Sequence, residues 1–410
     1  MSFKSIIDHY YAIYVFMGVM SFISFGEKWA SIVVLLIIMT TVWSYFKRPY
    51  KLNALDGVMI LFILYQFFSY AFSNYPMRLW YMGIKNQIIP MLFYFIGRNL
   101  MFADNKMLVN MKTPMMVAMV FGLILYFWAP DWYIAKRTEI FLTAESSTNL
   151  YYEVTRLASF WPWSYTMGYA SLIFIMYYCR DFFRKDVGIY NQICLLVAVL
   201  VLFFAQQRTT MAFFVVFLAL FTFFSPKEQR KKLLYVWFII ILIMIGITYY
   251  MMNYADSDFV EYVLGRSIES DENIVEQRFG LYQRFWGTSL FGEGLGKYGH
   301  AAVFETHTAS ITDCEYIRMM SELGIVGCII FGLIYVKAMW KSFFNIKVYF
   351  FEFCMLSFYL AAMIGATPLE NGSMQNFLFW YCVGRVGRDQ ILIENKNLKH
   401  IDYGGSKVYA

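Results

Sequence analysis

Residues 190–224 read Tyr190-Asn-Gln-Ile-Cys-Leu-Leu-Val-Ala-Val-Leu-Val-Leu-Phe-Phe-Ala205, Gln206-Gln-Arg-Thr-Thr210 and Met211-Ala-Phe-Phe-Val-Val-Phe-Leu-Ala-Leu-Phe-Thr-Phe-Phe224. Two apolar runs, the first near the length that crosses about 30 Å of hydrocarbon as a helix and the second shorter, are joined by a short polar segment. That segment leaves almost no loop to hold Arg208 in water. The stretch therefore predicts two membrane-spanning helices with a charged side chain in the turn between them.

The same apolar character extends over the whole chain. Of the 410 residues, 60% are hydrophobic and 15% are charged, whereas soluble domains devote about a quarter of their residues to charge. We expect an all-α polytopic membrane protein with about twelve spans. The expected spans are Tyr10–Phe25, Trp29–Phe46, Gly57–Ser73, Gln87–Ala103, Pro114–Pro130, Leu157–Cys179, Tyr190–Ala205, Met211–Phe224, Leu233–Met252, Met319–Trp340, Val348–Ala366 and Gln375–Gly384.

The spans divide the chain into four parts. Spans one to nine occupy residues 1–252, a large extracytoplasmic loop occupies 253–318, spans ten to twelve occupy 319–384, and a cytoplasmic tail occupies 385–410. Basic residues of short loops favour the cytoplasmic side. Placing the N-terminus inside puts the basic clusters around Lys47, Arg184, Lys231 and Lys341 on that side and returns the C-terminus to it. This distribution explains the net charge of +6 without a nucleic-acid partner.

The 253–318 loop carries charged, glycine and aromatic residues that a simple connection does not need. Loops of this length in compact proteins are usually functional or disordered. The aromatic residues of this loop can form a packed core, so we expect it to be ordered. Gly294 and Gly296 lie in Gly292-Glu-Gly-Leu-Gly296, where backbone amides could approach an anionic ligand. A plain turn is the alternative. The match of Gly294–Gly299 to a dinucleotide fingerprint lacks the strand that this motif requires.

Several arginines fall on the expected outer side of the membrane: Arg156, Arg208, Arg278 and Arg284. Their placement runs against the positive-inside tendency, so we interpret it as a sign of an anionic ligand. A lipid-linked diphosphate is the natural candidate at an outer membrane face. The alternative is that such side chains extend to the interface, and for Arg318 this alternative has equal weight.

Groups suited to acid–base chemistry cluster before the tenth span. His307 carries an imidazole, a group suited to proton transfer near neutral pH, and the carboxylates Asp313 and Glu315 directly precede the span. The carboxylates also fit a helix cap. The spacing of His300, Glu305 and His307 is too loose for zinc, so no metal site is expected.

The order of these motifs resembles the superfamily of O-antigen ligases and polysaccharide repeat-unit polymerases. The resemblance rests on Gly292-Glu-Gly-Leu-Gly296, Asp313-Cys-Glu-Tyr316 and Glu322-Leu-Gly-Ile-Val-Gly327, and on Arg156-Leu-Ala-Ser-Phe-Trp-Pro162 and Arg208 earlier in the chain. It extends from about residue 156 to residue 327. Ligases of this group typically carry histidine at the position of Asp313, so the residue favours an O-antigen or capsular polysaccharide polymerase over a ligase.

The resemblance implies a glycosyltransferase that joins oligosaccharide repeats linked to polyprenyl diphosphate (undecaprenyl diphosphate) at the outer face of the bacterial plasma membrane. The product would be O-antigen of lipopolysaccharide, capsule or exopolysaccharide, formed without a cofactor. A flippase and a chain-length regulator are the implied partners. Asp313 is the first candidate for the general base, followed by His307 and Glu315, and the four external arginines bind the diphosphate. The alternatives are a ligase and a non-enzymatic flippase or exporter of the same lipid-linked sugar.

Overall fold

The computed structural model describes residues 3–20, 22, 28–47, 51–72, 75–102, 104–142, 156–161, 164–182, 188–225, 229–235, 237–238, 289–299, 302, 314–370 and 374–388. Every regular element among these residues is helical. The elements are α1 (Phe3–Asp8), α2 (Tyr10–Met20), α3 (Lys28–Lys47), α4 (Ala54–Phe68), η2 (Ser69–Phe72), α5 (Met77–Gly83), η3 (Ile84–Ile88), α6 (Ile89–Arg98), η4 (Leu100–Phe102), α7 (Lys106–Val109), α8 (Lys112–Trp128), α9 (Asp131–Leu142), α11 (Ser164–Phe182), α12 (Ile189–Phe204), α13 (Arg208–Phe224), α18 (Glu315–Phe344), α19 (Ile346–Gly365) and α20 (Met374–Gly387).

Four stretches of the described chain are helical, long and apolar enough to cross a membrane: Ala54–Ala71, Leu100–Trp128, Glu315–Phe344 and Ile346–Gly365. Shorter apolar helices occur at Tyr10–Met20, Leu35–Lys47, Ile189–Phe204 and Arg208–Phe224. The expected all-α class is confirmed, together with the presence of helices fit to span a bilayer. The number of twelve spans and the large loop stay predictions.

The outward face of α18 has the character of a surface that meets lipid. A row of large apolar side chains at helical spacing is 41–66% exposed, whereas the opposite face packs into the bundle. Such a row is unfavourable in water and favourable against hydrocarbon. Its members are Ile325, Ile329, Leu333, Val336 and Trp340.

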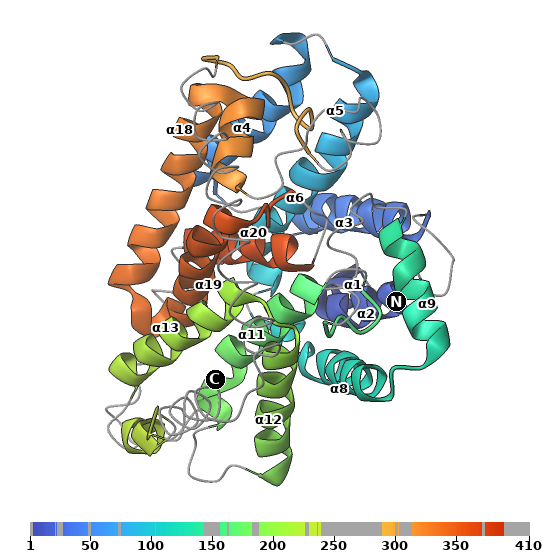
Figure 1. Cartoon of the computed structure of the whole chain (residues 1–410). Coiled ribbons are helices and arrows are strands. Elements are labelled where there is room, and N and C mark those ends of the chain that lie inside the picture. The colour runs from blue at the N-terminus through green and yellow to red at the C-terminus, as the bar shows by residue number, and fades with distance from the viewer. Residues whose placement is uncertain are drawn as a thin grey trace, which may run out of the picture.

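Helices α6 and α20 form the centre of the bundle, with α19 beside α20 and α4 packed along α18 (Figure 1). Their backbones approach so closely that only glycine fits at two crossing points. A Cβ atom at Gly97 would meet the Tyr381 carbonyl group, and one at Gly384 would meet the Tyr94 carbonyl group. Because small residues permit this approach, both helices are buried along most of their length.

The bundle has two ends with different polar chemistry. At one end, which we call the basic end, the Asn53 side chain donates to the Gly387 carbonyl (3.2 Å) and the Tyr349 hydroxyl donates to the Arg388 carbonyl (3.0 Å). At the other, the loop end, residues 289–299 bond to the first turns of α18, and the start of α20 bonds to the α19–α20 connection. Helices α4 and α19 run from the basic end to the loop end, and α6, α18 and α20 run in the opposite direction.

Several helix boundaries differ from the expected spans, and α18 begins at Glu315 instead of Met319, which takes the last residues of the expected loop into the helix. Helix α11 begins at Ser164 instead of Leu157, because residues 157–161 form a buried irregular segment and the residue before Pro162 disfavours helix. The expected tail begins at Arg385, but α20 continues to Gly387 and Arg385 forms an ion pair with Glu352 (2.6 Å). Most of the expected span Leu233–Met252 and of the 253–318 loop lies outside the described residues.

Candidate functional site

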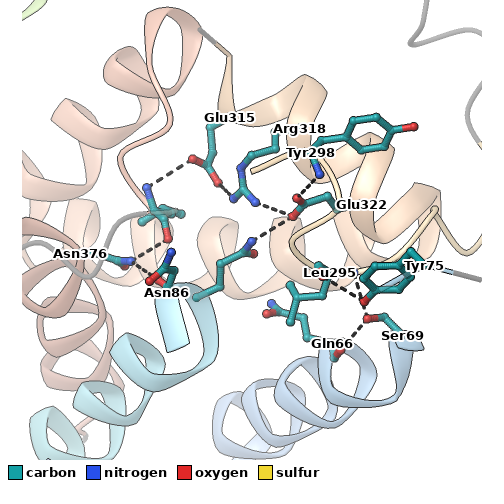
Figure 2. Close-up of polar contacts among 12 residues, drawn as sticks. Gln66, Ser69, Tyr75, Asn86, Leu295, Tyr298, Glu315, Arg318, Glu322 and Asn376 are labelled. Carbon is teal, nitrogen blue, oxygen red and sulfur yellow. Dashed lines mark hydrogen bonds and ion pairs between the residues drawn. The ribbon is translucent and has the colours of Figure 1, made fainter. Parts of the chain in front are cut away.

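Three charged side chains share one buried face at the start of α18. Glu315, Arg318 and Glu322 are spaced three and four residues apart, which brings them together on a helix. The Arg318 Nη1 atom lies 2.5 Å from Glu322 Oε2, and the Nη2 atom is paired with Glu315. All three side chains are at most 1% exposed. Figure 2 shows Arg318 between the two carboxylates.

Groups from other parts of the chain also donate hydrogen bonds to the carboxylates of Glu322 and Glu315. Gln87 Nε2 donates to Glu322 Oε2 (2.9 Å), and the Tyr298 amide donates to Glu322 Oε1 (3.0 Å). The Leu369 amide donates to Glu315 Oε2 (3.3 Å). The cluster therefore joins α18, η3, residues 289–299 and the α19–α20 connection into one network (Figure 2). Such a network of mutually bonded groups holds its members in a single geometry.

A third carboxylate, that of Glu370, approaches the same cluster and is 2% exposed. Gly299 lies directly against it, since a Cβ at that glycine would meet Glu370 Oε1. Three carboxylates thus surround the single guanidinium of Arg318, whose two terminal nitrogens both face glutamate. Arg318 neither extends to the interface nor offers its fork to a diphosphate. Its role is to hold the two glutamates in place.

The glycine-rich turn packs on a kink in α18. Gly324 has φ +65°, a left-handed conformation that interrupts the helix and that glycine adopts without strain. The interruption frees two carbonyl groups: the Glu293 amide donates to Ser321 (2.8 Å) and the Gly294 amide donates to Glu322 (3.0 Å). Gly292 reaches the same backbone, with φ +78°. Two motifs that are far apart in the sequence are therefore parts of one structure.

The same turn is fastened to the end of α4 and to the start of α5. The Leu295 amide donates to Ser69 Oγ (3.2 Å), and the Tyr75 hydroxyl donates to the Leu295 carbonyl (3.0 Å). Burial raises the pKa of Tyr75 above its usual value, so the phenol stays neutral and keeps its donor proton. Gly296 packs against the backbone of Leu79 and Gly83. The amides of Glu293, Gly294 and Leu295 are thus used within the protein, as in a structural turn.

Gln87 reaches the cluster from a π-helical turn, η3, that precedes Pro90 in α6. Proline lacks an amide donor, and a π-turn is one way in which a helix accommodates the disturbed bonding. The neighbouring Asn86 carbonyl accepts a hydrogen bond from Asn376 (3.3 Å) at the start of α20. Asn376 also donates to the Leu369 carbonyl (2.6 Å), which fixes the connection that holds Glu315.

Arg156 and Arg208 both lie at the loop end. The Leu157 amide donates to the Phe204 carbonyl (3.1 Å), which places the two arginine-bearing segments beside each other. Arg137 Nη1 donates to the Arg156 carbonyl (2.6 Å) and so holds this segment. Arg208 is exposed at the first residue of α13 and Arg156 is half-buried. Two of the four predicted diphosphate ligands are therefore at the end of the bundle that carries the cluster.

The other predicted site residues have different outcomes. Asp313, His307, Arg278 and Arg284 lie outside the described residues, and their roles stay predictions. Cys314 and Glu315, which directly follow Asp313, are fixed by the hydrogen bond from the Glu315 amide to the Ala366 carbonyl (3.1 Å).

Sequence reasoning missed Glu322, Gln87 and Glu370 as members of the site. The spacing of Glu315, Arg318 and Glu322 on one helix face was a readable signal for the first. Gln87 and Glu370 gave none, because they join the cluster only through tertiary packing.

Two cavities adjoin the cluster. A small one, with room for about one water molecule, is lined in part by Gln66, Gln87, Glu315 and Arg318. A larger apolar pocket lies between α18 and α19, and its lining includes Tyr316, Cys328, Tyr335, Leu360 and Met363. Met319 and Phe331 line both cavities and form the wall between them.

The fold and the cluster define an all-helical, membrane-associated protein with a buried polar network at one end of its bundle. No protein-family model matches the chain, and no curated protein matches its sequence.

Proposed function

We propose that the protein is a membrane glycosyltransferase that polymerises polyprenyl-diphosphate-linked oligosaccharide repeats at the outer face of the bacterial plasma membrane. The observation that carries the proposal is the direct bonding of the glycine-rich turn to the kink of α18. The motifs on which the family resemblance rests, Gly292–Gly296 and Glu322–Gly327, form one unit through the amides of Glu293 and Gly294. A shared structural unit is a physical reason for the two motifs to occur together.

The proposed roles separate binding from positioning. Arg156 and Arg208, with Arg278 and Arg284, bind the diphosphate, because a guanidinium fork matches phosphate oxygens and stabilises the charge of the leaving group. The cluster around Arg318 carries an excess of carboxylates and does not suit an anion. It anchors the start of α18, from which Asp313 presents a carboxylate to the acceptor hydroxyl group.

An apolar chain with an anionic head fits the surroundings of this end. The apolar pocket between α18 and α19 lies next to the cluster, separated from it by Met319 and Phe331. A polyprenyl donor combines these two properties, since its hydrocarbon chain prefers apolar surface and its diphosphate prefers arginine. Glycosyl transfer then moves the growing chain from its diphosphate carrier to the hydroxyl group of the next repeat, and the carrier diphosphate leaves.

The proposal is tested in a deletion strain by extracting the lipid-linked saccharides and locating them across the membrane. A polymerase predicts single lipid-linked repeats on the outer face and no polymer. Repeats trapped on the inner face would instead identify a flippase, and long polymer that is not attached to its final acceptor would identify a ligase.

A further inference from the structure

A buried guanidinium without a hydrogen bond lies at the basic end. Arg388 is 1% exposed, and its Nε, Nη1 and Nη2 atoms make no hydrogen bond with any part of the chain that the structure describes. The backbone around it is fixed. The Arg388 amide donates to the Arg385 carbonyl (3.1 Å), and the Arg388 carbonyl accepts from Tyr349 (3.0 Å). The unsatisfied guanidinium is therefore attached to a firmly held segment.

Two carboxylates at the basic end are bound to other arginines. Asp56 accepts from Arg98 Nε (2.8 Å) and Nη2 (2.7 Å), and Arg98 itself packs against Gly387. Glu352 is paired with Arg385 at 2.6 Å. Within the described residues, three guanidinium groups thus share two carboxylates, and the charge of Arg388 is the one left over.

This arrangement is unfavourable for a protein without a ligand. Burial, together with the nearby charges of Arg385 and Arg98, lowers the pKa of Arg388 to about 10. Tyr381 and Tyr349 lie near Arg388, but their hydroxyl groups donate to backbone carbonyls and carry no full charge. Burying an unpaired cation is unfavourable, and a neutral side chain of similar size would avoid this cost.

The location of Arg388 suggests the chemistry of the missing partner. The basic end is where α4 and α19 begin and where α18 ends, and each of these helices is long enough to span a bilayer. Phosphate groups of phospholipids lie at the ends of membrane-spanning helices, and guanidinium binds two phosphate oxygens at once. We propose that Arg388 is an anion site for a phosphate group, at the opposite end of the bundle from the candidate functional site.

The test uses the full-length protein, purified and delipidated in detergent, with its thermal unfolding midpoint as the readout. The probes are phosphatidylglycerol, diacylglycerol with the same chains but no phosphate, and inorganic phosphate. Phosphatidylglycerol should raise the midpoint and diacylglycerol should not. The variant Arg388→Gln should need about ten-fold more phosphatidylglycerol or worse, because hydrogen bonds to charged groups contribute on the order of ten-fold each.

A matched control is Lys347→Gln, which removes an exposed charge near the same end and should respond like the wild type. Arg388→Lys keeps the charge but loses the fork, so its response should be intermediate. Without lipid, Arg388→Gln should be at least as stable as the wild type, because it removes a buried unpaired charge. If inorganic phosphate alone raises the midpoint through Arg388, the phosphate site stands and its source is soluble.

Three results would overturn the proposal. The first is an equal response of Arg388→Gln and wild type to phosphatidylglycerol. The second is the absence of any response of the wild type to either source of phosphate. The third is a large loss of stability in delipidated Arg388→Gln and Arg388→Lys, which would show that the side chain holds the fold by itself.

Discussion

Asp313 is the residue whose predicted role is most directly tested by substitution. The acceptor hydroxyl group must lose a proton as it attacks the anomeric carbon, and asparagine cannot accept that proton. We expect Asp313→Asn to abolish polymer while the amount of protein in the membrane is unchanged, measured by gel analysis of extracted polysaccharide and by immunoblot. His300→Ala is the control and should have a mild effect. Normal polymer in Asp313→Asn would reduce that carboxylate to a helix cap and move the base to His307.

Arg208 tests the predicted diphosphate clamp. Lysine keeps the positive charge but loses the planar fork that binds two phosphate oxygens, so Arg208→Lys should lower polymer formation severely. Arg78→Lys is a matched control, because Arg78 is also exposed and belongs to α5, which packs against the same glycine turn. Equal polymer yields from the two variants would remove Arg208 from the clamp.

The Arg318 cluster makes a prediction about stability. Glu322→Gln leaves part of the buried charge of Arg318 uncompensated and replaces one of the two acceptor oxygens by a donor, so it should cost on the order of 3 kcal/mol. The control is Lys136→Gln, which breaks a partly exposed pair with Glu139 and should cost about 0.2–1 kcal/mol. Chemical unfolding of both variants in detergent gives the comparison. Equal losses would mean that the buried network contributes no more than a surface pair.

At the residue scale, the sequence indicated which segments carry the charged residues of the site but not which of these residues contact one another. The sequence was equally compatible with Arg318 at the membrane interface and with Arg318 buried in the protein, because the spacing of residues does not show how deeply a side chain is buried. Its burial depends on Gln87 and Leu369, which reach the cluster from η3 and from the α19–α20 connection. Such contacts are set by tertiary packing, so no local pattern predicts them.

At the scale of elements, the kink at Gly324 joins α18 to the glycine turn. Gly324→Ala places a Cβ at a backbone conformation that is essentially restricted to glycine and directly against the Gly292 nitrogen, which costs about 1–3 kcal/mol from the backbone alone. We expect the turn to detach and trypsin to cleave faster after Lys297. Gly332→Ala is the control in the same helix: nothing lies within 4 Å of its Cβ position, and alanine favours helix. Unchanged cleavage in Gly324→Ala would show that the turn does not depend on the kink.

The helices themselves were largely predictable from hydrophobic runs. The expected spans at Pro114–Pro130, Tyr190–Ala205 and Met211–Phe224 match α8, α12 and α13 within a few residues. The irregular features were less predictable. The π-turn before Pro90 and the kink of α18 at Gly324 depend on the residues that pack against them. The apolar composition of a segment predicts neither feature.

For the whole molecule, the alternating direction of the helices makes membrane sidedness testable. Helix α13 begins with Arg208 at the loop end, and its last turn packs against Phe350 near the start of α19, at the basic end. Arg230, which precedes Lys231, donates to the Thr222 carbonyl (3.1 Å), so these residues belong to the basic end. Residues 289–299 belong to the loop end. Positions after Lys231 and within 256–275 should therefore face opposite sides of the membrane.

Alkaline phosphatase fusions measure this sidedness directly, because the enzyme is active only outside the cytoplasm. The density of lysine and arginine at the basic end favours the cytoplasm for that end. A fusion after Lys231 should be inactive, and a fusion within residues 256–275 should be active. A third fusion in the α18–α19 turn at Asn345 should be inactive, since that turn lies between Lys341 and Lys347. The reverse pattern would move the loop end, and with it the proposed polymerase site, to the cytoplasmic side, where lipid-linked repeats are assembled and not yet joined.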